Sequence, residues 1–230
     1  MIGTVLNLYL VRHGLTAWNI AGRYQGWSDI PLAREGKKQA RQTAECFAVH
    51  RALHGLEFGA IYTSPLWRAQ QTAGIIGEWL NIEPLVVPGL REMNGGAIEG
   101  LTEAEWQARY PELAPDWRDT SNLEFGWPGG ETRRAFRARC LHTISSLLSQ
   151  HAPSDHVIIV AHGGVIRSYV SSIESDGQRV PDTYDVANCS ITQVQLSAPS
   201  GPDGEVMRAV GCLRSFNQVG HLREHVAATR

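Results

Sequence analysis

The apolar run "VIIVA" at residues 157–161 restricts the possible folds most, because it has no polar position. A strand that is apolar on both faces has to be covered on both faces, which is typical of parallel sheets. Strand-like runs also alternate along the chain with longer segments whose apolar residues have helical spacing. The expected strands span residues 5–11, 59–63, 84–87, 157–161, 190–196 and 207–215, and the expected helices span residues 33–53, 67–80, 131–150 and 163–173. This alternation predicts an α/β fold, a three-layer sandwich with a mainly parallel central sheet flanked by helices.

Two segments interrupt the alternation and are expected to lie outside the sheet and its helices. Residues 22–31 and residues 94–130 have no clear period, and the second segment is rich in proline and tryptophan. We expect the chain to form a single domain over residues 1–230, with a cap-like insertion at roughly residues 94–130. The stretch "SAPSGPDGE", residues 197–205, predicts an exposed hairpin turn.

The charge balance and the lengths of the apolar runs argue against several classes of partner. The formal net charge is −2, so no overall basic field favours nucleic acid or a membrane surface. Apolar runs of about five residues are far too short to span a bilayer, and "MIGTVLNLYLVR" lacks the features of a signal peptide. The cysteines match no zinc spacing and are expected to be reduced thiols. We therefore expect a cytoplasmic protein whose oligomeric state stays open, with a homodimer as one alternative.

Charged side chains follow the predicted strands at the points where the strands end. The strand ends deliver Arg12-His13-Gly14, Ser64 with Arg68 a few residues on, Arg91-Glu92, and His162-Gly163-Gly164. In doubly wound sheets, ligands bind outside the carboxyl ends of the strands, so these groups are expected to meet at one edge. Singly, each has a plainer interpretation as a solvated strand end, a helix cap or a surface residue. Together at one edge, they favour a functional site.

Phosphoryl transfer through a histidine is the chemistry that fits this set of groups. A neutral imidazole is a competent nucleophile at pH 7, because its unperturbed pKa is about 6.5. Attack on phosphorus gives a covalent phosphohistidine and divides one difficult step into two. Arginine offers phosphate a permanently charged bidentate fork, and a helix that opens at Gly163 would point backbone N–H groups at the anion. A carboxylic acid can then protonate the leaving oxygen.

An ordered series of stretches carries a family resemblance. It begins with "LVRHGLTAWN" and continues with "YQGWSDIPLAREGKKQA", "IYTSPLWRAQQTA", "LREMNGGAIEGLT", "PGGET", "VIIVAHGGVIRSYV", "NCSIT" and "NQVGHL". The series resembles the histidine phosphatase superfamily, also called the phosphoglycerate mutase-like family, over nearly the whole chain. The letters RHG alone are a weak signal, whereas the complete order is a specific one.

The resemblance implies a role for each matched residue. His13 is expected to be the nucleophile and Glu92 the proton donor, and Arg12, Arg68 and His162 are expected to complete the phosphate pocket. The positions expected to line the phosphate or the substrate are Thr16, Asn19, Gln25, Gly26 and Gly163. The resemblance implies no cofactor and no metal.

Histidine pairs at helical spacing are the alternative metal ligands in the chain. His50 with His54, and His221 with His225, could each bind zinc from one face of a helix. Neither pair has an evident third ligand, so metal binding is not favoured.

Departures from the family pattern bear on the reaction. "MNGGAIEG" lacks the aromatic residue that relatives often carry after the acid, which concerns the local shape beside Glu92. "RHGLT" and "AHGGVIR" are more similar to phosphatases than to the mutase forms "RHGES" and "AHGNSLR". We therefore favour a metal-independent phosphomonoester hydrolase acting on a small phosphorylated metabolite. A mutase-type phosphoryl transfer and a non-catalytic phosphate-binding regulatory protein remain the alternatives.

Overall fold

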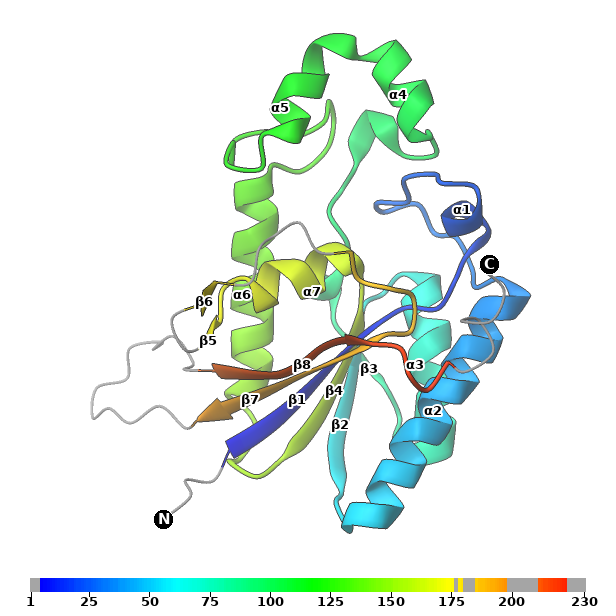
Figure 1. Cartoon of the computed structure of the whole chain (residues 1–230), viewed down its shortest axis with the longest axis vertical. Helices are drawn as coiled ribbons and strands as arrows, with labels where there is room; N and C mark the ends of the chain where they lie inside the picture. Colours follow the sequence, from blue (N-terminus) through cyan, green and yellow to red (C-terminus); the bar gives the residue numbers. More distant parts are fainter. Residues whose placement is uncertain (1–4, 176–177, 180–184, 198–210, 223–230) are drawn as a thin grey trace.

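The computed structural model describes residues 5–175, 178–179, 185–197 and 211–222, and it is built around a six-stranded sheet (Figure 1). The strands are β1 (Val5–Arg12), β2 (Phe58–Thr63), β3 (Leu85–Val86), β4 (His156–Ala161), β7 (Ile191–Ser197) and β8 (Gly211–Gln218). Their order in the sheet is β3-β2-β4-β1-β7-β8. Strands β1 to β4 are parallel to one another, whereas β7 and β8 are antiparallel additions at one side. The sheet is therefore mainly parallel, as the sequence predicted.

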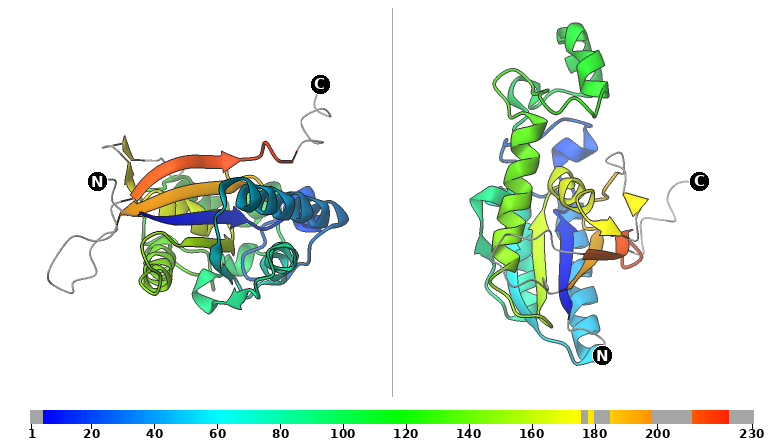
Figure 2. Two further views of the ribbon diagram at one scale, coloured as in Figure 1. Left: turned by 90° about the horizontal axis from the view of Figure 1, so that it is seen from below. Right: turned by 90° about the vertical axis from the view of Figure 1, so that its left-hand side faces the viewer.

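Helices cover both faces of the sheet, which explains the apolar run in β4. Leu8 and Leu10 of β1 face the core shared with α6 (Arg133–Leu148) and α7 (Gly163–Val170). Tyr9, between them, faces the core shared with α2 (Arg34–His54) and α3 (Trp67–Leu80). Successive residues of a strand point to opposite faces, so a central strand needs apolar residues at every position. Figure 2 shows α6 and α2 on opposite sides of the sheet, which completes the three predicted layers.

The segment 94–130 lies beyond the carboxyl ends of the parallel strands, and it contains more regular structure than its sequence indicated (Figure 1). Its elements are the 3₁₀ turns η2 (Gly96–Ile98) and η3 (Pro111–Leu113) and the short helices α4 (Glu103–Arg109) and α5 (Ala114–Arg118). A small core of its own holds the segment, with Ile98, Trp106, Ala114, Phe125 and Trp127 at its centre. We call residues 94–130 the cap.

The prediction that the cap is irregular was wrong for α4, which is a helix with a recognisable start signal in the sequence. The Thr102 side chain accepts a hydrogen bond from the backbone N–H of Glu105, and Glu105 returns the bond to the N–H of Thr102. This reciprocal pair is a capping box, which the spacing of Thr102 and Glu105 predicts.

Smaller differences concern the ends of elements. The helix expected to run to residue 173 ends at Val170 and is followed by a two-stranded ribbon, β5 (Glu174–Ser175) with β6 (Gln178–Arg179). The last strand begins at Gly211, and the start of the strand expected from residue 207 lies outside the described residues. Most of the predicted turn at 197–205 also lies outside them. Among the described residues, no helix has the length and apolar character needed to cross a membrane.

The remaining short connections place 3₁₀ and helical turns at the sheet edge. The turn η1 (Pro88–Leu90) follows β3 and leads directly to the predicted acid. A single helical turn, α1 (Ala17–Ile20), follows the stretch that leaves β1. Of these two turns, α1 lies at the same end of the sheet as the cap (Figure 1).

Candidate active site

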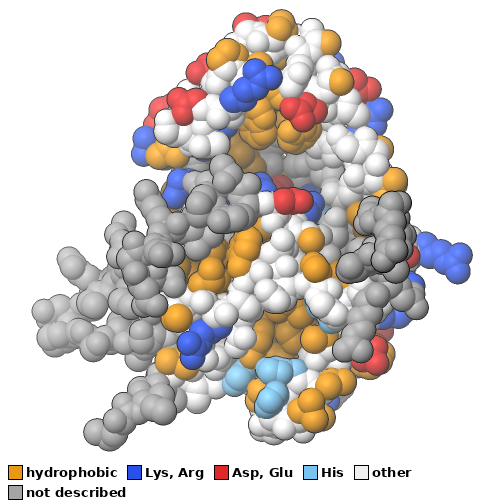
Figure 3. Space-filling view, viewed as in Figure 1, with side chains coloured by type: hydrophobic (Ala, Val, Ile, Leu, Met, Phe, Trp, Pro, Cys, Tyr) orange, Lys and Arg blue, Asp and Glu red, His pale blue; other side chains and the backbone are white. Residues whose placement is uncertain are grey.

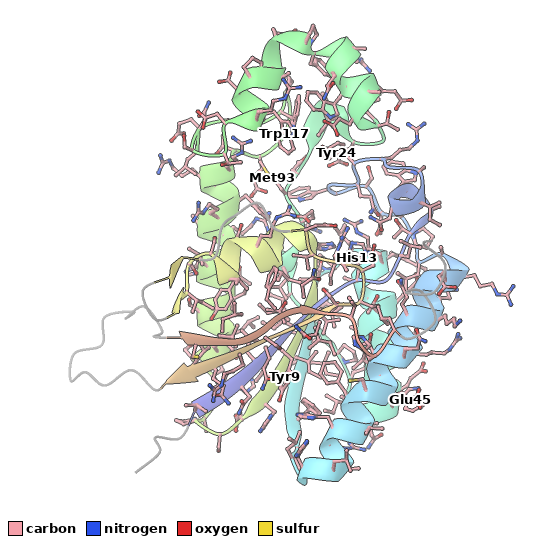
Figure 4. The ribbon with its side chains drawn as sticks, in the orientation of Figure 1. Tyr9, His13, Tyr24, Glu45, Met93 and Trp117 are labelled. Carbon is pink, nitrogen blue, oxygen red and sulfur yellow. The ribbon has the colours of Figure 1, made fainter. Side chains whose placement is uncertain are left out.

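The structure brings the five predicted catalytic residues together at the carboxyl edge of the sheet. Arg12 ends β1 and His13 follows it, Arg68 lies in the first turn of α3, and His162 precedes α7. Glu92 comes just after η1. Figure 4 shows His13 at this edge, below Tyr24, Met93 and Trp117.

The His13 imidazole is held in one orientation and one tautomer. Its side chain is buried, and Nδ1 lies 2.8 Å from the carbonyl oxygen of Gly14. A carbonyl oxygen can only accept a hydrogen bond, so Nδ1 carries the proton and Nε2 keeps its lone pair. The backbone is held on both sides, because the His13 N–H donates to Ala161 and the Asn188 side chain donates to the His13 carbonyl at 2.9 Å.

The second histidine lies beside the first. The ring centroids of His13 and His162 are 5.2 Å apart, and His162 is fully buried. Nε2 of His162 lies 2.8 Å from the Ser64 hydroxyl, so a residue at the end of β2 orients the ring. Nδ1 of His162 is buried and has no hydrogen-bond partner among the described residues.

Two arginines approach the histidines and are held by carbonyl oxygens. Arg68 is 1% exposed and donates from its two terminal nitrogens to the carbonyls of Gly26 at 2.7 Å and Ser28 at 2.8 Å. Arg12 donates to the carbonyl of Val186 and lies 3.9 Å from the Asp185 carboxylate, which is largely exposed. The Nε atoms of both arginines are buried without a partner in the described part of the chain. An anion is the complementary partner for such donors.

Burial and positive neighbours keep both histidines neutral. Burial, followed by the charges of Arg68 and Arg12, lowers the pKa of His13 well below its ordinary value. Burial and Arg68 also lower the pKa of His162 well below that value, with a further contribution from His13. Burial lowers the pKa of Arg68 to about 10, so this side chain stays charged at neutral pH. The edge therefore combines neutral imidazoles with fixed positive charge.

The side chain of Glu92 reaches the first turn of α7. Its carboxylate accepts hydrogen bonds from the backbone N–H of Met93 at 2.8 Å and of Gly164 at 3.0 Å. A Cβ atom on Gly164 would lie 2.2 Å from Glu92 Oε1, so only glycine leaves room for the carboxylate there. The side chain of Trp27 donates from Nε1 to the Glu92 carbonyl at 2.7 Å. An aromatic residue from a different segment thus lies beside Glu92, where the sequence lacks the usual one.

A pocket of about 570 Å³ opens between this edge and the cap. Figure 3 shows the hollow, with charged side chains at its floor and hydrophobic side chains under the cap. Glu92 is the one carboxylate among the described residues that line it, whereas its arginines are Arg12, Arg23, Arg68, Arg118, Arg133, Arg137 and Arg167. Its aromatic residues are Tyr24, Trp117, Trp127 and Phe136. Such a pocket suits a negatively charged organic ligand.

Three of the five predicted substrate-binding residues line the pocket, and two do not. Asn19, Gln25 and Gly26 line the pocket. Thr16 is fully buried and caps α1, with its hydroxyl 3.0 Å from the side-chain oxygen of Gln25. Gly163 is buried and precedes Gly164, which lines the pocket, and neither Gly163 nor Thr16 is among the described residues that line it.

The tryptophans of the cap serve mainly as its core. Trp106 and Trp127 are buried, with ring centroids 4.9 Å apart. Trp117 is partly exposed and lines the pocket. Packing therefore accounts for most of these aromatic residues, and Trp117 and Trp127 also reach the ligand space.

The alternative metal ligands do not form a site in the described residues. No group of three or more His, Cys, Asp and Glu side chains suited to a metal ion occurs among them. His50 and His54 pack edge to face with ring centroids 4.5 Å apart, and the pair is remote from the candidate site, on α2. His225 lies outside the described residues, so the second pair stays untested.

Sequence reasoning assigned no role to several residues that contact the site. Ser64 orients His162, Asn188 holds the His13 carbonyl, and Trp27 holds the Glu92 carbonyl. Ser64 ends a predicted strand and Asn188 lies in a family-like stretch, so position offered a hint for both. Trp27 also lies in a family-like stretch, but its contact with Glu92 could not be predicted because the two residues are remote in sequence.

Comparisons with known proteins identify the family and agree with the fold. A sequence model of the histidine phosphatase superfamily (branch 1) matches residues 8–202. An uncharacterized phosphatase, PhoE of Bacillus subtilis (strain 168), is 33% identical over 180 residues, which cover 78% of this chain and 83% of that protein. A probable phosphoglycerate mutase, GpmB of Cronobacter sakazakii (strain ATCC BAA-894), is 31% identical over 215 residues, covering 90% and 93% of the two chains. The structure of a mycobacterial glucosyl-3-phosphoglycerate phosphatase is similar with a TM-score of 0.77 and 27% identity, covering 94% of this chain and all of that one.

The fold and the paired histidines at its edge define an α/β enzyme of the phosphatase and mutase class. More particularly, the chain belongs to the histidine phosphatase superfamily, as the ordered stretches of its sequence indicated.

Proposed function

We propose that the protein is a metal-independent phosphomonoester hydrolase that acts through a phosphohistidine at His13. The observation that carries this proposal is the hydrogen bond of 2.8 Å between His13 Nδ1 and the Gly14 carbonyl. It leaves the Nε2 lone pair unprotonated on a residue that lines the pocket beside two arginines. A neutral imidazole held in this way is a nucleophile for phosphorus.

The reaction takes place in two balanced steps. Nε2 of His13 forms a bond to phosphorus while the bond from phosphorus to the ester oxygen breaks. Glu92, as the carboxylic acid, gives its proton to the leaving oxygen, and an alcohol departs. Water then attacks the phosphohistidine and gives a proton to the Glu92 carboxylate, which releases inorganic phosphate and neutral His13.

The other predicted groups stabilise the transferred phosphoryl group. Arg12 and Arg68 offer positive charge to its equatorial oxygens. His162 donates a hydrogen bond to the same oxygens from the nitrogen that has no protein partner. The backbone at Gly163 and Gly164, where α7 begins, directs the positive end of the helix toward the anion.

The pocket supports an organic leaving group of appreciable size. Its volume of about 570 Å³ exceeds what a phosphate group alone needs. Its arginines and aromatic residues suit small phosphomonoesters such as sugar phosphates, phosphoglycerates or nucleotide-related esters. The similar mycobacterial structure is named a glucosyl-3-phosphoglycerate phosphatase, which supports the same class of substrate for this chain.

A mutase reaction is the second candidate, because a probable phosphoglycerate mutase covers 90% of the chain at 31% identity. A mutase would return the phosphoryl group from His13 to a bound intermediate instead of water. A non-catalytic phosphate-binding role is the third candidate, and it gives no reason for both a nucleophile and an acid to be present.

A screen of phosphorylated metabolites tests the three candidates against each other. Release of inorganic phosphate is measured for each compound, and a mutase assay is run with and without bisphosphoglycerate. We expect phosphate release, and acid-labile, base-stable phosphoprotein trapped on His13. The His13→Ala variant should lose turnover of p-nitrophenyl phosphate, and an unchanged rate would reject the mechanism. Isomerisation that depends on bisphosphoglycerate would instead favour a mutase, and phosphate binding without turnover would favour a regulatory role.

A further inference from the structure

We propose that Glu99 is a positioning residue that sets both Arg68 and Glu92 in place through the loop at residues 25–28. This inference rests on the proposed function, since it assigns a support to two of the groups in that mechanism. Glu99 is in the cap, near the end of the stretch "MNGGAIEG", which lacks the aromatic residue that relatives often carry after the acid.

The Glu99 carboxylate binds the loop with both of its oxygens. Oε1 accepts hydrogen bonds from the backbone N–H groups of Trp27 at 2.7 Å and Gly95 at 3.0 Å. Oε2 accepts from the backbone N–H of Ser28 at 2.9 Å and from its hydroxyl at 2.7 Å. Both oxygens act as acceptors in these contacts, and three of the four partners are backbone N–H groups that can only donate.

The same loop holds Arg68. The carbonyls of Gly26 and Ser28 accept the hydrogen bonds from the two terminal nitrogens of its guanidinium group. A guanidinium bound at both ends has a fixed plane, and its remaining donors point away from the loop. The loop therefore determines how Arg68 presents itself to a phosphoryl group, and Glu99 determines where the loop lies.

A second connection runs from the loop to Glu92. The Trp27 backbone is bound by Glu99, and the Trp27 indole donates to the Glu92 carbonyl at 2.7 Å. The guanidinium of Arg91 lies over the Trp27 ring, 5.2 Å from its centroid. Movement of the loop would therefore also displace the backbone that carries the proton donor.

Close contacts around Glu99 and within the cap explain why Gly26 and Gly96 are glycines. A Cβ atom on Gly26 would lie 2.1 Å from Glu99 Oε1, and Gly26 has a φ of +48°. A Cβ atom on Gly96 would lie 2.4 Å from the Pro128 carbonyl, and Gly96 has a φ of +50°. Glycine adopts such angles without strain, so these residues let the cap, Glu99 and the loop approach one another.

The Glu99→Gln variant tests the assignment, because it keeps the shape of the side chain and removes its charge. One oxygen becomes an NH₂ group, which faces donors and cannot accept from them. We expect kcat/KM for p-nitrophenyl phosphate to fall about 10- to 100-fold, a range taken from the loss of residues that orient metal ligands. The matched control is Glu124→Gln, which removes an exposed carboxylate paired with Arg134, and it should leave the rate unchanged.

A double-mutant cycle separates positioning from general damage to the fold. If Glu99 acts through Arg68, Glu99→Gln should lower kcat/KM for p-nitrophenyl phosphate by at most about 3-fold in an Arg68→Lys background. The reason is that the effects of substitutions at two interacting residues do not add. Independent losses that multiply would overturn the proposal. The inhibition constant for inorganic phosphate gives a second readout, and Glu99→Gln should raise it by about 10-fold through the weakened Arg68 contact. An unchanged inhibition constant would contradict the proposal even if turnover fell.

Trp27→Phe separates the two connections, because it removes the indole N–H and keeps an aromatic ring. This variant should slow esters with poor leaving groups more than p-nitrophenyl phosphate, whereas Glu99→Gln should slow both. Equal effects of the two variants on both esters would reject the separate connection to Glu92. If the unmodified protein binds inorganic phosphate but hydrolyses no ester, the proposed function fails, and calorimetric binding of phosphate to Glu99→Gln still tests this assignment.

Discussion

The imidazole rings of His13 and His162 are 5.2 Å apart at their centroids, with their planes inclined by 58°. Each ring is fixed by a different partner, the Gly14 carbonyl for His13 and the Ser64 hydroxyl for His162. Two imidazolium ions at this distance would repel each other in a site that already contains Arg12 and Arg68. The pair therefore stays neutral, and the pH dependence of the protein follows from this neutrality.

Activity should persist on the acid side of neutrality. The pKa of His13 lies well below about 6.5 because of its burial and of Arg68 and Arg12. The pH dependence of kcat/KM reports ionisable groups of the free enzyme. The midpoint of its decrease at acid pH should therefore lie below about 6.5. The measurement is kcat/KM for p-nitrophenyl phosphate between pH 5 and pH 8, corrected for ionisation of the substrate. A midpoint that remains at about 6.5 after this correction would contradict the expectation.

Folding stability should decrease as the pH falls below about 6.5. In the unfolded chain His13 and His162 bind protons around that pH, whereas in the folded chain both pKa values are lowered by burial and by Arg68. The unfolded state then binds more protons, so the free energy of unfolding decreases with decreasing pH, and the contribution is complete above that range. The check is the difference in Tm between pH 7.5 and pH 5.5, which should be smaller in His162→Asn than in the unmodified protein. Equal differences in the two proteins would count against it.

The sequence predicted the sheet and its edge well because those features depend on local patterns. The ends of β1 and β4 follow from apolar runs, and so do His13 and His162 immediately after them. The supports of the site could not be predicted in this way. Trp27 and Glu99 are far apart along the chain, and only the folded tertiary structure brings the Glu99 carboxylate to the Trp27 N–H at 2.7 Å.

Replacing Gly14 by alanine should damage both stability and the site. A Cβ atom there would lie 2.5 Å from the Gly36 carbonyl oxygen, so the backbone must move. We expect a loss of about 1–3 kcal/mol in the free energy of unfolding and a loss of turnover, because the Gly14 carbonyl holds His13. Gly74→Ala in α3 is the matched control, since nothing lies within 4 Å of its added Cβ atom. It should be stabilising by about 0.5–1 kcal/mol in urea unfolding, and equal effects of the two variants would reject the steric argument.

Chelation should leave the activity intact. In the proposed mechanism His13 is the nucleophile and Arg12 and Arg68 carry the positive charge, so each step uses groups of this chain. The rate with p-nitrophenyl phosphate should be the same before and after dialysis against EDTA. A loss that added divalent cations restore would show that the mechanism lacks an essential component.

Glu92→Gln should separate esters by the quality of their leaving groups. A poor leaving group needs a proton as its bond to phosphorus breaks, whereas p-nitrophenolate departs without one. The variant keeps the size of the side chain and one of the two acceptor oxygens, which can still accept from the Gly164 N–H at the start of α7, whereas the Met93 N–H then loses its side-chain acceptor. General acid catalysis contributes about 10²- to 10⁴-fold, and we expect a loss in this range for an alkyl phosphate and a much smaller one for p-nitrophenyl phosphate. Measuring the first turnover by rapid mixing isolates the step that uses the proton, because the later attack of water also involves Glu92. Equal slowing of that first step for both esters would mean that another group supplies the proton.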